Sequence, residues 1–234
     1  MGLSMSPIIV ALDYPTKQAA LDMAQQLDPE VCRVKVGKEL FTSCGPAIVE
    51  ELQQKNFEVF LDLKFHDIPT TTAKAVRAAA NLGVWMVNVH ASGGQRMLAA
   101  CREAIDKSPH KPLLIAVTVL TSMDSSDFQT LGYTTTPEEY ALALAKLSYN
   151  CGVDGIVCSA FEASSIKNHT HKDFLTVTPG IRLKENSLDD QRRIMTPVEA
   201  VKNNADYLVI GRPVTQAKSP SVAVQNIVKE LFSF

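Results

Sequence analysis

The sequence of 234 residues lacks long apolar runs, an excess of charge of one sign and paired cysteines. No run reaches the roughly 18 apolar residues that a membrane span needs, and the N-terminus has no charged-then-apolar signal pattern. The net charge of −2 provides no basic surface for nucleic acid or an anionic membrane. Five cysteines without a C-x-x-C pair are typical of reduced thiols. We therefore expect a cytoplasmic protein that binds neither nucleic acid nor membrane.

The common motifs for cofactors and metals are also missing. The chain contains no G-x-G-x-x-G sequence and no P-loop. No set of histidine, cysteine and acidic residues has the spacing of metal ligands, and no serine, histidine and acid suggest a triad. We therefore expect a site that holds no cofactor and no metal.

Short β-branched runs alternate with longer amphipathic segments, and the runs are nearly all apolar, as in strands buried on both faces of a parallel sheet. Eight such units predict a single-domain (β/α)8 TIM barrel of the α/β class, with an open doubly wound sheet as the alternative. We expect one domain over residues 1–234, in which residues 1–6 form a flexible leader. The predicted strands are Ile8–Leu12, Arg33–Val36, Val59–Leu63, Trp85–Val89, Leu113–Val119, Gly155–Cys158, Leu175–Thr178 and Tyr207–Ile210. The clearest helical segments are Gln18–Leu27, Ala73–Leu82, Met97–Lys107, Pro137–Asn150 and Val222–Phe232.

Polar or charged residues follow nearly every apolar run, where the predicted strand ends. In a (β/α)8 barrel these ends meet at one rim, which holds the active site of such enzymes. One charged strand end is usually just solvated, but the repetition predicts an active site at this rim. The residues are Asp13, Lys35, Gly37, Asp62, Lys64, Asp67, His90, Thr118, Thr121, Ser159, Gly180, Arg182, Gly211 and Arg212.

The third run ends in the most distinctive motif, in which Asp62 and Lys64 are two residues apart and so share a face of the strand. That face is expected to be the barrel interior, because Leu61, Leu63 and Phe65 need the other side. A carboxylate and an ammonium group are thus placed in a confined polar pocket.

Two further charges are expected beside this pair. Asp67 lies just past the strand and can add a second carboxylate, and Lys35 on the neighbouring strand can add a second cation. Buried charges stabilise a fold weakly, so a cluster of four favours a functional explanation. The alternative is a salt-bridge network that plugs the mouth of the barrel.

A second set of residues is typical of a phosphate site. Gly211 and Arg212 follow the eighth run, and Gly180, Arg182 and Gln191 follow the seventh. Barrel enzymes commonly bind phosphate between these two loops, where glycine exposes backbone N–H groups and arginine supplies a fork of donors. The alternative is that Arg212 pairs with an acid at the rim.

The chain closely resembles the orotidine 5′-phosphate decarboxylase family in its short bacterial form. The resemblance runs from Ile8–Asp13 to Val209–Pro213 and is most specific in Phe60–Pro69, Thr178–Arg182 and Asp190–Arg193. It implies cofactor-free decarboxylation of orotidine 5′-monophosphate to UMP, the last step of UMP synthesis.

The resemblance also implies roles for individual residues. Lys64 resembles the proton donor to C6 of the pyrimidine, and Asp62 the carboxylate beside the substrate carboxylate. Asp67 resembles the residue that each subunit lends to its partner, which implies a homodimer with shared active sites. Asp13 and Lys35 correspond to contacts with the ribose hydroxyls and the charge network, and Thr121 to a pyrimidine contact. The implied substrate site also includes Leu63, Phe65, His66, Ile68, Pro69, Thr70 and Thr71, with Arg182, Gln191, Gly211 and Arg212 around the phosphate.

Three other functions are weighed against this one. Mg²⁺-dependent sugar-phosphate decarboxylases and hexulose-phosphate synthases of the same superfamily share an Asp-x-Lys-x-x-Asp segment, but they place a glutamate ligand where this chain has Lys35. A Schiff-base aldolase needs a neutral lysine, whereas flanking aspartates would raise the pKa of Lys64. A nucleotide-binding sensor needs the phosphate site without the charged cluster.

Overall fold

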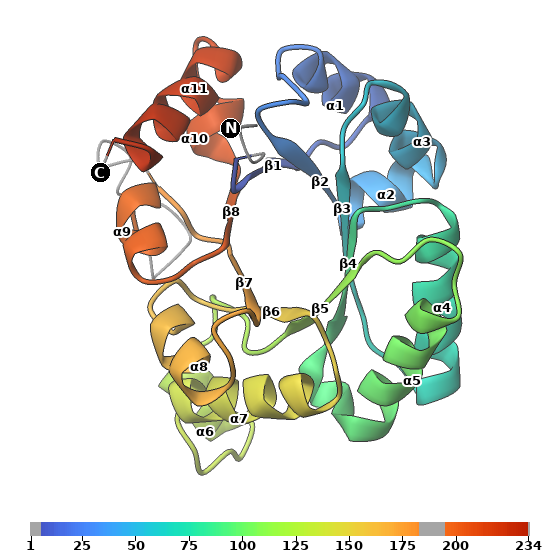
Figure 1. The fold of residues 1–234 in the computed structure, drawn as a ribbon, viewed down its shortest axis with the longest axis vertical. Helices are drawn as coiled ribbons and strands as arrows, with labels where there is room; N and C mark the ends of the chain where they lie inside the picture. Colours follow the sequence, from blue (N-terminus) through green and yellow to red (C-terminus); the bar gives the residue numbers. More distant parts are fainter. Residues whose placement is uncertain (1–5, 183–194, 234) are drawn as a thin grey trace.

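The computed structural model describes residues 6–182 and 195–233, and Figure 1 looks along its barrel. Eight parallel strands pair in chain order, and the first pairs with the last to close the ring. This confirms the (β/α)8 barrel and excludes the open doubly wound sheet. The strands are β1 (Ile8–Leu12), β2 (Arg33–Gly37), β3 (Val59–Phe65), β4 (Met86–His90), β5 (Leu113–Val117), β6 (Gly155–Val157), β7 (Leu175–Thr178) and β8 (Tyr207–Ile210).

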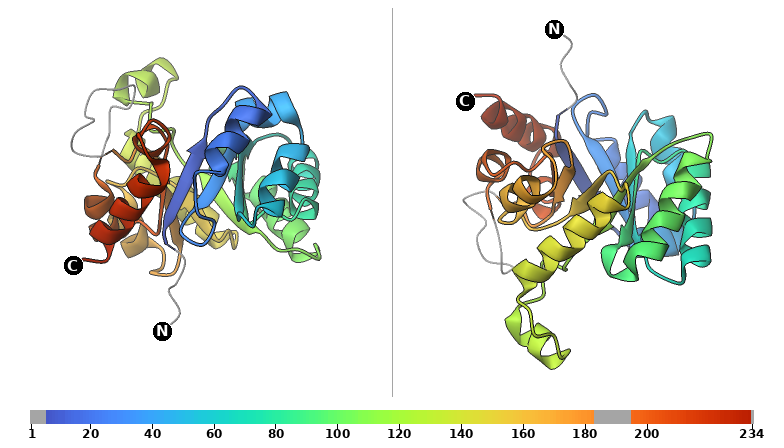
Figure 2. Two further views of the ribbon diagram at one scale, coloured as in Figure 1. Left: turned by 90° about the horizontal axis from the view of Figure 1, so that it is seen from above. Right: turned by 60° about the horizontal axis from the view of Figure 1, so that its bottom comes forward.

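Helices surround the strands, and α6 projects beyond the ring that the others form (Figure 2). Thr136 and Thr196 begin α7 and α9 with capping boxes, in which threonine and a glutamate three residues later satisfy each other's backbone N–H. Within the described ranges, no helix combines the length and apolar character needed to cross a membrane. The helices are α1 (Lys17–Ala24), α2 (Lys38–Cys44), α3 (Ala47–Gln54), α4 (Pro69–Asn81), α5 (Gly94–Asp106), α6 (Ser125–Thr130), α7 (Pro137–Asn150), α8 (Ala163–His169), α9 (Pro197–Lys202), α10 (Arg212–Thr215) and α11 (Pro220–Leu231), with a 3-10 turn at Ala91–Gly93.

The strands separate two apolar layers. An outer layer packs strands against helices and includes Val34 and Val36 of β2. An inner cluster, which includes Phe60 and Met86, fills the barrel. Since side chains alternate along a strand, the position of the two valines turns the intervening Lys35 of β2 inward.

The amino end of the barrel interior is filled by stacked side chains. The guanidinium of Arg33 lies 4.3 Å from the ring centroid of Trp85 and 5.4 Å from that of Tyr207. Its Nε also donates to Glu58 Oε2 at 2.7 Å, so the buried charge is paired. This stacked group closes one end and leaves the carboxyl end for polar groups.

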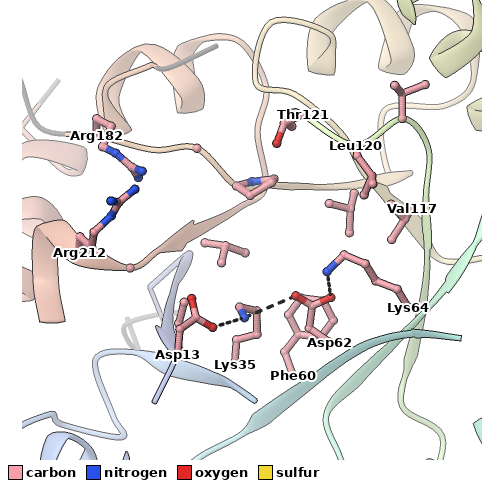
Figure 3. A pocket seen from close by; sticks show the side chains of 17 residues that line it. Asp13, Lys35, Phe60, Asp62, Lys64, Val117, Leu120, Thr121, Arg182 and Arg212 are labelled. Carbon is pink, nitrogen blue, oxygen red and sulfur yellow. Dashed lines mark hydrogen bonds and ion pairs between the residues drawn. The ribbon is translucent and has the colours of Figure 1, made fainter. Parts of the chain in front are cut away.

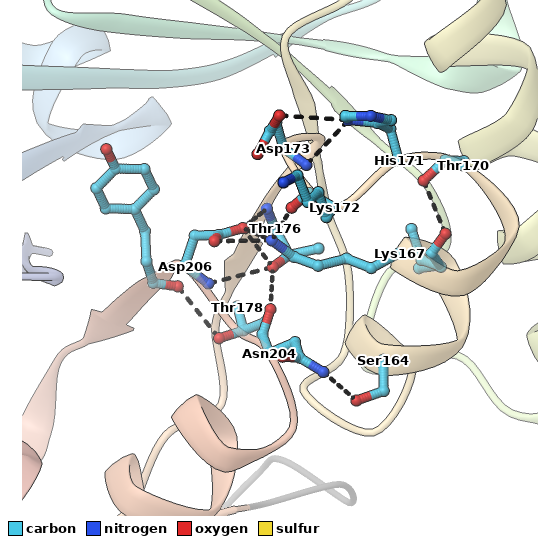
Figure 4. A network of polar contacts seen from close by, with 12 residues as sticks. Ser164, Lys167, Thr170, His171, Lys172, Asp173, Thr176, Thr178, Asn204 and Asp206 are labelled. Atoms are coloured by element: carbon cyan, nitrogen blue, oxygen red, sulfur yellow. Dashed lines mark hydrogen bonds and ion pairs between the residues drawn. The ribbon is translucent and has the colours of Figure 1, made fainter.

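Two aspartates that precede strands repeat one arrangement at the amino end. Asp206, before β8, accepts from the backbone N–H of Thr176 in β7 at 2.7 Å and pairs with Lys167 of α8 (Figure 4). Asp154, before β6, accepts from the backbone N–H of Leu114 in β5 at 2.7 Å. Each aspartate thus ties the start of one strand to the next.

Several predicted boundaries need correction. β5 ends at Val117 instead of Val119, β3 continues to Phe65, and α4 begins at Pro69 instead of Ala73. The flexible leader predicted over residues 1–6 is wrong at Ser6, which is buried and donates its hydroxyl to the carbonyl of Val31. Residues 1–5 lie outside the described part of the chain.

Candidate active site

A cavity of about 320 Å³ lies at the carboxyl ends of the strands (Figure 3). Its polar lining comes from residues within β2 and β3 and from residues that follow β1, β5, β7 and β8, so the structure brings together much of the predicted rim. The predicted residues that line it are Asp13, Lys35, Asp62, Lys64, Thr121, Gly180, Arg182, Gly211 and Arg212.

Four charges of alternating sign form a chain along one side of the cavity. Lys35 Nζ lies 3.0 Å from Asp13 Oδ1 and 3.5 Å from Asp62 Oδ2. Lys64 Nζ lies 2.6 Å from Asp62 Oδ1. Lys35 and Asp62 are buried, whereas Asp13 is exposed at the rim. The order is therefore carboxylate, ammonium, carboxylate, ammonium, with the last ammonium facing the cavity.

The two lysines keep the buried Asp62 ionised. Burial raises the pKa of Asp62, but the charges of Lys35 and Lys64 and hydrogen bonds from Lys64 and Asn88 more than offset it. The pKa of Asp62 therefore lies below its usual value. The Asp62 carboxylate is therefore negatively charged at neutral pH, although it is buried.

The predicted orientation of β3 is confirmed. Leu61, Leu63 and Phe65 pack in the outer layer, whereas Asp62 and Lys64 line the cavity. The backbone is nevertheless irregular here, because Lys64 has a left-handed φ of 52° and the register against β4 shifts between Leu61 and Phe65.

Asp67 does not join the cluster within one chain. β3 ends at Phe65 and the chain turns away toward α4, so Asp67 is exposed and accepts from the backbone N–H of Ile68 at 2.6 Å. Asp13 supplies the second carboxylate instead.

In the single chain the cavity is not lined by the predicted residues Leu63, Phe65, His66, Asp67, Ile68, Pro69, Thr70 or Thr71. A separate hollow of about 630 Å³ is lined by His66, Asp67, Ile68, Pro69, Ser92, Gly93, Gly94, Gln95 and Arg96.

Two arginines lie across the cavity from Lys64. The guanidinium groups of Arg182 and Arg212 point toward one another in Figure 3, and Gly180 and Gly211 line the cavity beside them. Gly180 has a φ of 80°, which favours glycine at this turn. Two cations that face each other suit a shared anion, as predicted for a phosphate. Gln191, the other predicted residue, lies outside the described part of the chain.

Sequence reasoning missed the apolar wall and one buried amide. Most of the apolar lining consists of ordinary core residues, with the exposed Leu120 as an exception, and only the fold shows which of them reach the cavity. Asn88 of β4 is fully buried and donates to Asp62 Oδ1 at 2.7 Å, yet it interrupts an apolar run without any motif. The missed apolar lining residues are Ala11, Phe60, Val117, Val119, Leu120, Val157 and Val209.

A closed barrel with a charged cluster facing an arginine pair at its carboxyl end defines a (β/α)8-barrel protein built for an anionic ligand. Comparison with known proteins is more specific. The chain belongs to the family described as "Orotidine 5'-phosphate decarboxylase / HUMPS family", whose sequence model matches residues 6–227.

Relatives extend over the whole chain. It is 59% identical to an orotidine 5′-phosphate decarboxylase of Pseudomonas fluorescens, with 99% of each chain covered. It is 60% identical to one of Pseudomonas aeruginosa, over 99% of this chain and 100% of that one. The solved orotidine 5′-phosphate decarboxylase of Lactobacillus acidophilus superposes with a TM-score of 0.87 at 35% identity, covering 97% of this chain and 100% of that chain.

Proposed function

We propose that the chain decarboxylates orotidine 5′-monophosphate to UMP, and is thus a lyase of pyrimidine biosynthesis. The observation that carries this proposal is the Lys35–Asp62–Lys64 cluster facing Arg182 and Arg212 across one cavity. A nucleotide monophosphate has its phosphate and its base at opposite ends and suits this separation. The full-length relatives named for the same reaction support it.

The chemistry needs charge rather than a conjugated electron sink. When the bond between C6 and the carboxylate breaks, the electron pair stays on C6 in the plane of the ring. The Lys64 ammonium stabilises this developing carbanion and then donates a proton to it, while CO₂ leaves. Asp62 holds the ammonium in place at 2.6 Å and, as a neighbouring like charge, disfavours the bound substrate carboxylate.

The remaining lining residues bind the substrate. Lys35 and Asp13 reach the ribose hydroxyls, and Thr121 contacts the pyrimidine. The phosphate is held by Arg182 and Arg212 with Gly180 and Gly211. Gln191, which follows β7 in the sequence as Arg182 does, is the other predicted phosphate contact. Binding energy from the distant phosphate then contributes to organising the site around the reacting carbon.

The reaction is proposed to need no metal and no cofactor. The Mg²⁺-dependent alternative requires an acidic ligand on β2, where this chain places the Lys35 ammonium 3.5 Å from Asp62 Oδ2. A cation at that point repels a divalent ion. Activity should therefore be unchanged in excess EDTA, and a loss restored by Mg²⁺ would favour the metal-dependent relatives.

The experiment that tests the function follows the loss of pyrimidine absorbance after orotidylate is added. The parent should turn over, whereas Lys64→Ala should lose turnover yet still fold and bind UMP, because the arginine pair is untouched. Circular dichroism and UMP titration provide the controls. If Lys64→Ala keeps activity within tenfold of the parent, the proton-donor role of Lys64 is contradicted. If the parent binds UMP but does not turn over orotidylate, the alternative of a nucleotide-binding sensor is favoured.

We also propose a homodimer with shared active sites. Asp67 is exposed just before α4, and the apolar Ile68 beside it is 66% exposed, which supports a second copy at this surface. Mixing Lys64→Ala with Asp67→Ala chains makes hybrid dimers in which one site has both groups. Random pairing should restore about a quarter of the parental activity, since about half of the dimers are hybrid and each has one intact site of two. No recovery despite proven subunit exchange would exclude sharing.

A further inference from the structure

Asn88 is a fully buried polar residue behind the charged cluster, outside the cavity lining. Its Nδ2 donates to Asp62 Oδ1 at 2.7 Å. Its Oδ1 accepts from the backbone N–H of Lys64 at 2.8 Å. One side chain therefore contacts both members of the ion pair that faces the substrate cavity.

The strand register explains why an amide is needed at this point. Leu61 pairs with Val87 and Phe65 with Val89, so three residues of β3 face the single residue Asn88 of β4. The backbone N–H of Lys64 lies in this irregular stretch and donates to the Asn88 side chain. A buried N–H without an acceptor is costly, so the side chain satisfies a bond that regular strand pairing does not supply.

The conformation of Lys64 also depends on its surroundings. Its φ of 52° is left-handed, which is unfavourable for a residue with a side chain and persists only where neighbouring contacts impose it. The Asn88 bond fixes the backbone at this residue, and the second Asn88 bond fixes the carboxylate that holds the Lys64 ammonium.

We propose that Asn88 is a positioning residue of the reaction, which sets the Lys64 ammonium by bridging its backbone N–H to the Asp62 carboxylate. The inference rests on the proposed function, because Lys64 is taken as the group that protonates the substrate. Asn88 does not line the cavity and is not proposed to touch the substrate.

The chemistry of the two bonds is specific to an amide. Aspartate has almost the same shape and can accept from Lys64, but it offers no donor to Asp62 and adds a like charge. Alanine removes both bonds. Asn88→Asp and Asn88→Ala therefore test different parts of the bridge.

The test measures kcat and KM with orotidylate, the Kd of UMP, and the melting temperature of both variants. Removing a hydrogen bond to a charged group should lower kcat by roughly tenfold to a hundredfold. KM and the UMP affinity should change by less than about threefold, because the lining residues remain. Asn88→Asp should lower kcat at least as much as Asn88→Ala, because the donor to Asp62 is lost and a second negative charge is added.

A matched control separates positioning from general stability. Thr176→Val removes a buried hydroxyl at the opposite end of the barrel, which lies 2.9 Å from the carbonyl oxygen of Asn204 and 3.0 Å from Asp206 Oδ2 and accepts from the backbone N–H of Asp206 at 3.2 Å. It should lower the melting temperature while kcat stays parental. The proposal is overturned if both Asn88 variants keep kcat within threefold, or if kcat and UMP affinity fall together. If Asn88→Ala does not fold, the kcat and UMP affinity of Asn88→Asp alone decide the outcome. A parent protein that does not decarboxylate orotidylate would instead refute the proposed function.

Discussion

Replacing Arg212 by alanine should separate phosphate recognition from the chemistry at C6. Arg212 is the first residue of α10, directly after Gly211. Its guanidinium lies across the cavity from Lys64 and points toward that of Arg182 (Figure 3). The change therefore removes one of two cations at the proposed phosphate end and leaves the Asp62–Lys64 pair intact.

The size of the effect follows from the number of charge-assisted bonds removed. A hydrogen bond between charged groups contributes about 1.5–3 kcal/mol, and about 1.4 kcal/mol corresponds to a tenfold change in rate. Loss of one such contact should lower kcat/KM for orotidylate by about tenfold to a few hundredfold. Arg182 remains in the variant, so residual phosphate binding is expected. With orotidine, which has no phosphate, the same variant should have nearly parental kcat/KM.

The assay compares parent and variant on both substrates, with and without phosphite dianion added to orotidine. Phosphite should activate the parent more than Arg212→Ala, because it occupies the vacant phosphate position. Lys218→Ala removes an exposed positive charge from the segment after α10 and should match the parent on both substrates. An equal loss of Arg212→Ala activity on orotidylate and orotidine would mean that Arg212 supports the rim structurally.

Two further predictions concern stability. Burial, and to a smaller extent the charges of His66 and two nearby lysines, lowers the pKa of His90 from 6.5 to about 4. As the pH falls, the histidine is therefore protonated in the unfolded chain at a higher pH than in the folded chain. The free energy of unfolding should consequently decrease as the pH drops from about 6.5 to about 4. In His90→Gln this decrease should be smaller than in the parent by about 1–2 kcal/mol, because the partly exposed ring feels less than the full shift. Urea unfolding of both proteins from pH 7 to 4.5 measures it, and an equal loss of stability in parent and variant would contradict the prediction. Asp206→Asn should destabilise the fold by about 1–3 kcal/mol with kcat unchanged, because it weakens the tie between β7 and β8. The exposed Asp173→Asn serves as control, and equal unfolding midpoints would refute the role of Asp206.

The barrel could be predicted because the alternation of apolar strands and amphipathic helices is repeated eight times. Its boundaries could not all be predicted, because an apolar residue does not reveal which cluster it joins. Val119 continues the apolar run of β5, yet it packs with Phe128 and Ala141 in a separate cluster. β3 is longer than expected because pairing resumes at Phe65 after the register shift.

The charged half of the site could be predicted because strand ends converge in a barrel and charges are conspicuous among apolar runs. Strict alternation along the strand predicts that Asp62 and Lys64 face the barrel interior. The structure places both there through an irregular strand, in which Lys64 adopts a left-handed φ and bonds to Asn88. Alternation thus predicts the correct face but not the residue that maintains it, since a single asparagine within an apolar run has no distinguishing pattern.

The choice of the second carboxylate shows how sequence distance differs from spatial distance. Asp67 is three positions after Lys64, but the turn into α4 carries it away, and the parallel pairing of β1 with β2 brings Asp13 beside Lys35 instead. Within one chain the cluster therefore has two carboxylates and two ammonium groups. In the proposed dimer the partner subunit's Asp67 would add a third carboxylate and make the cluster net negative. A substrate carboxylate bound there is then disfavoured until it leaves as neutral CO₂, after which the Lys64 ammonium protonates C6.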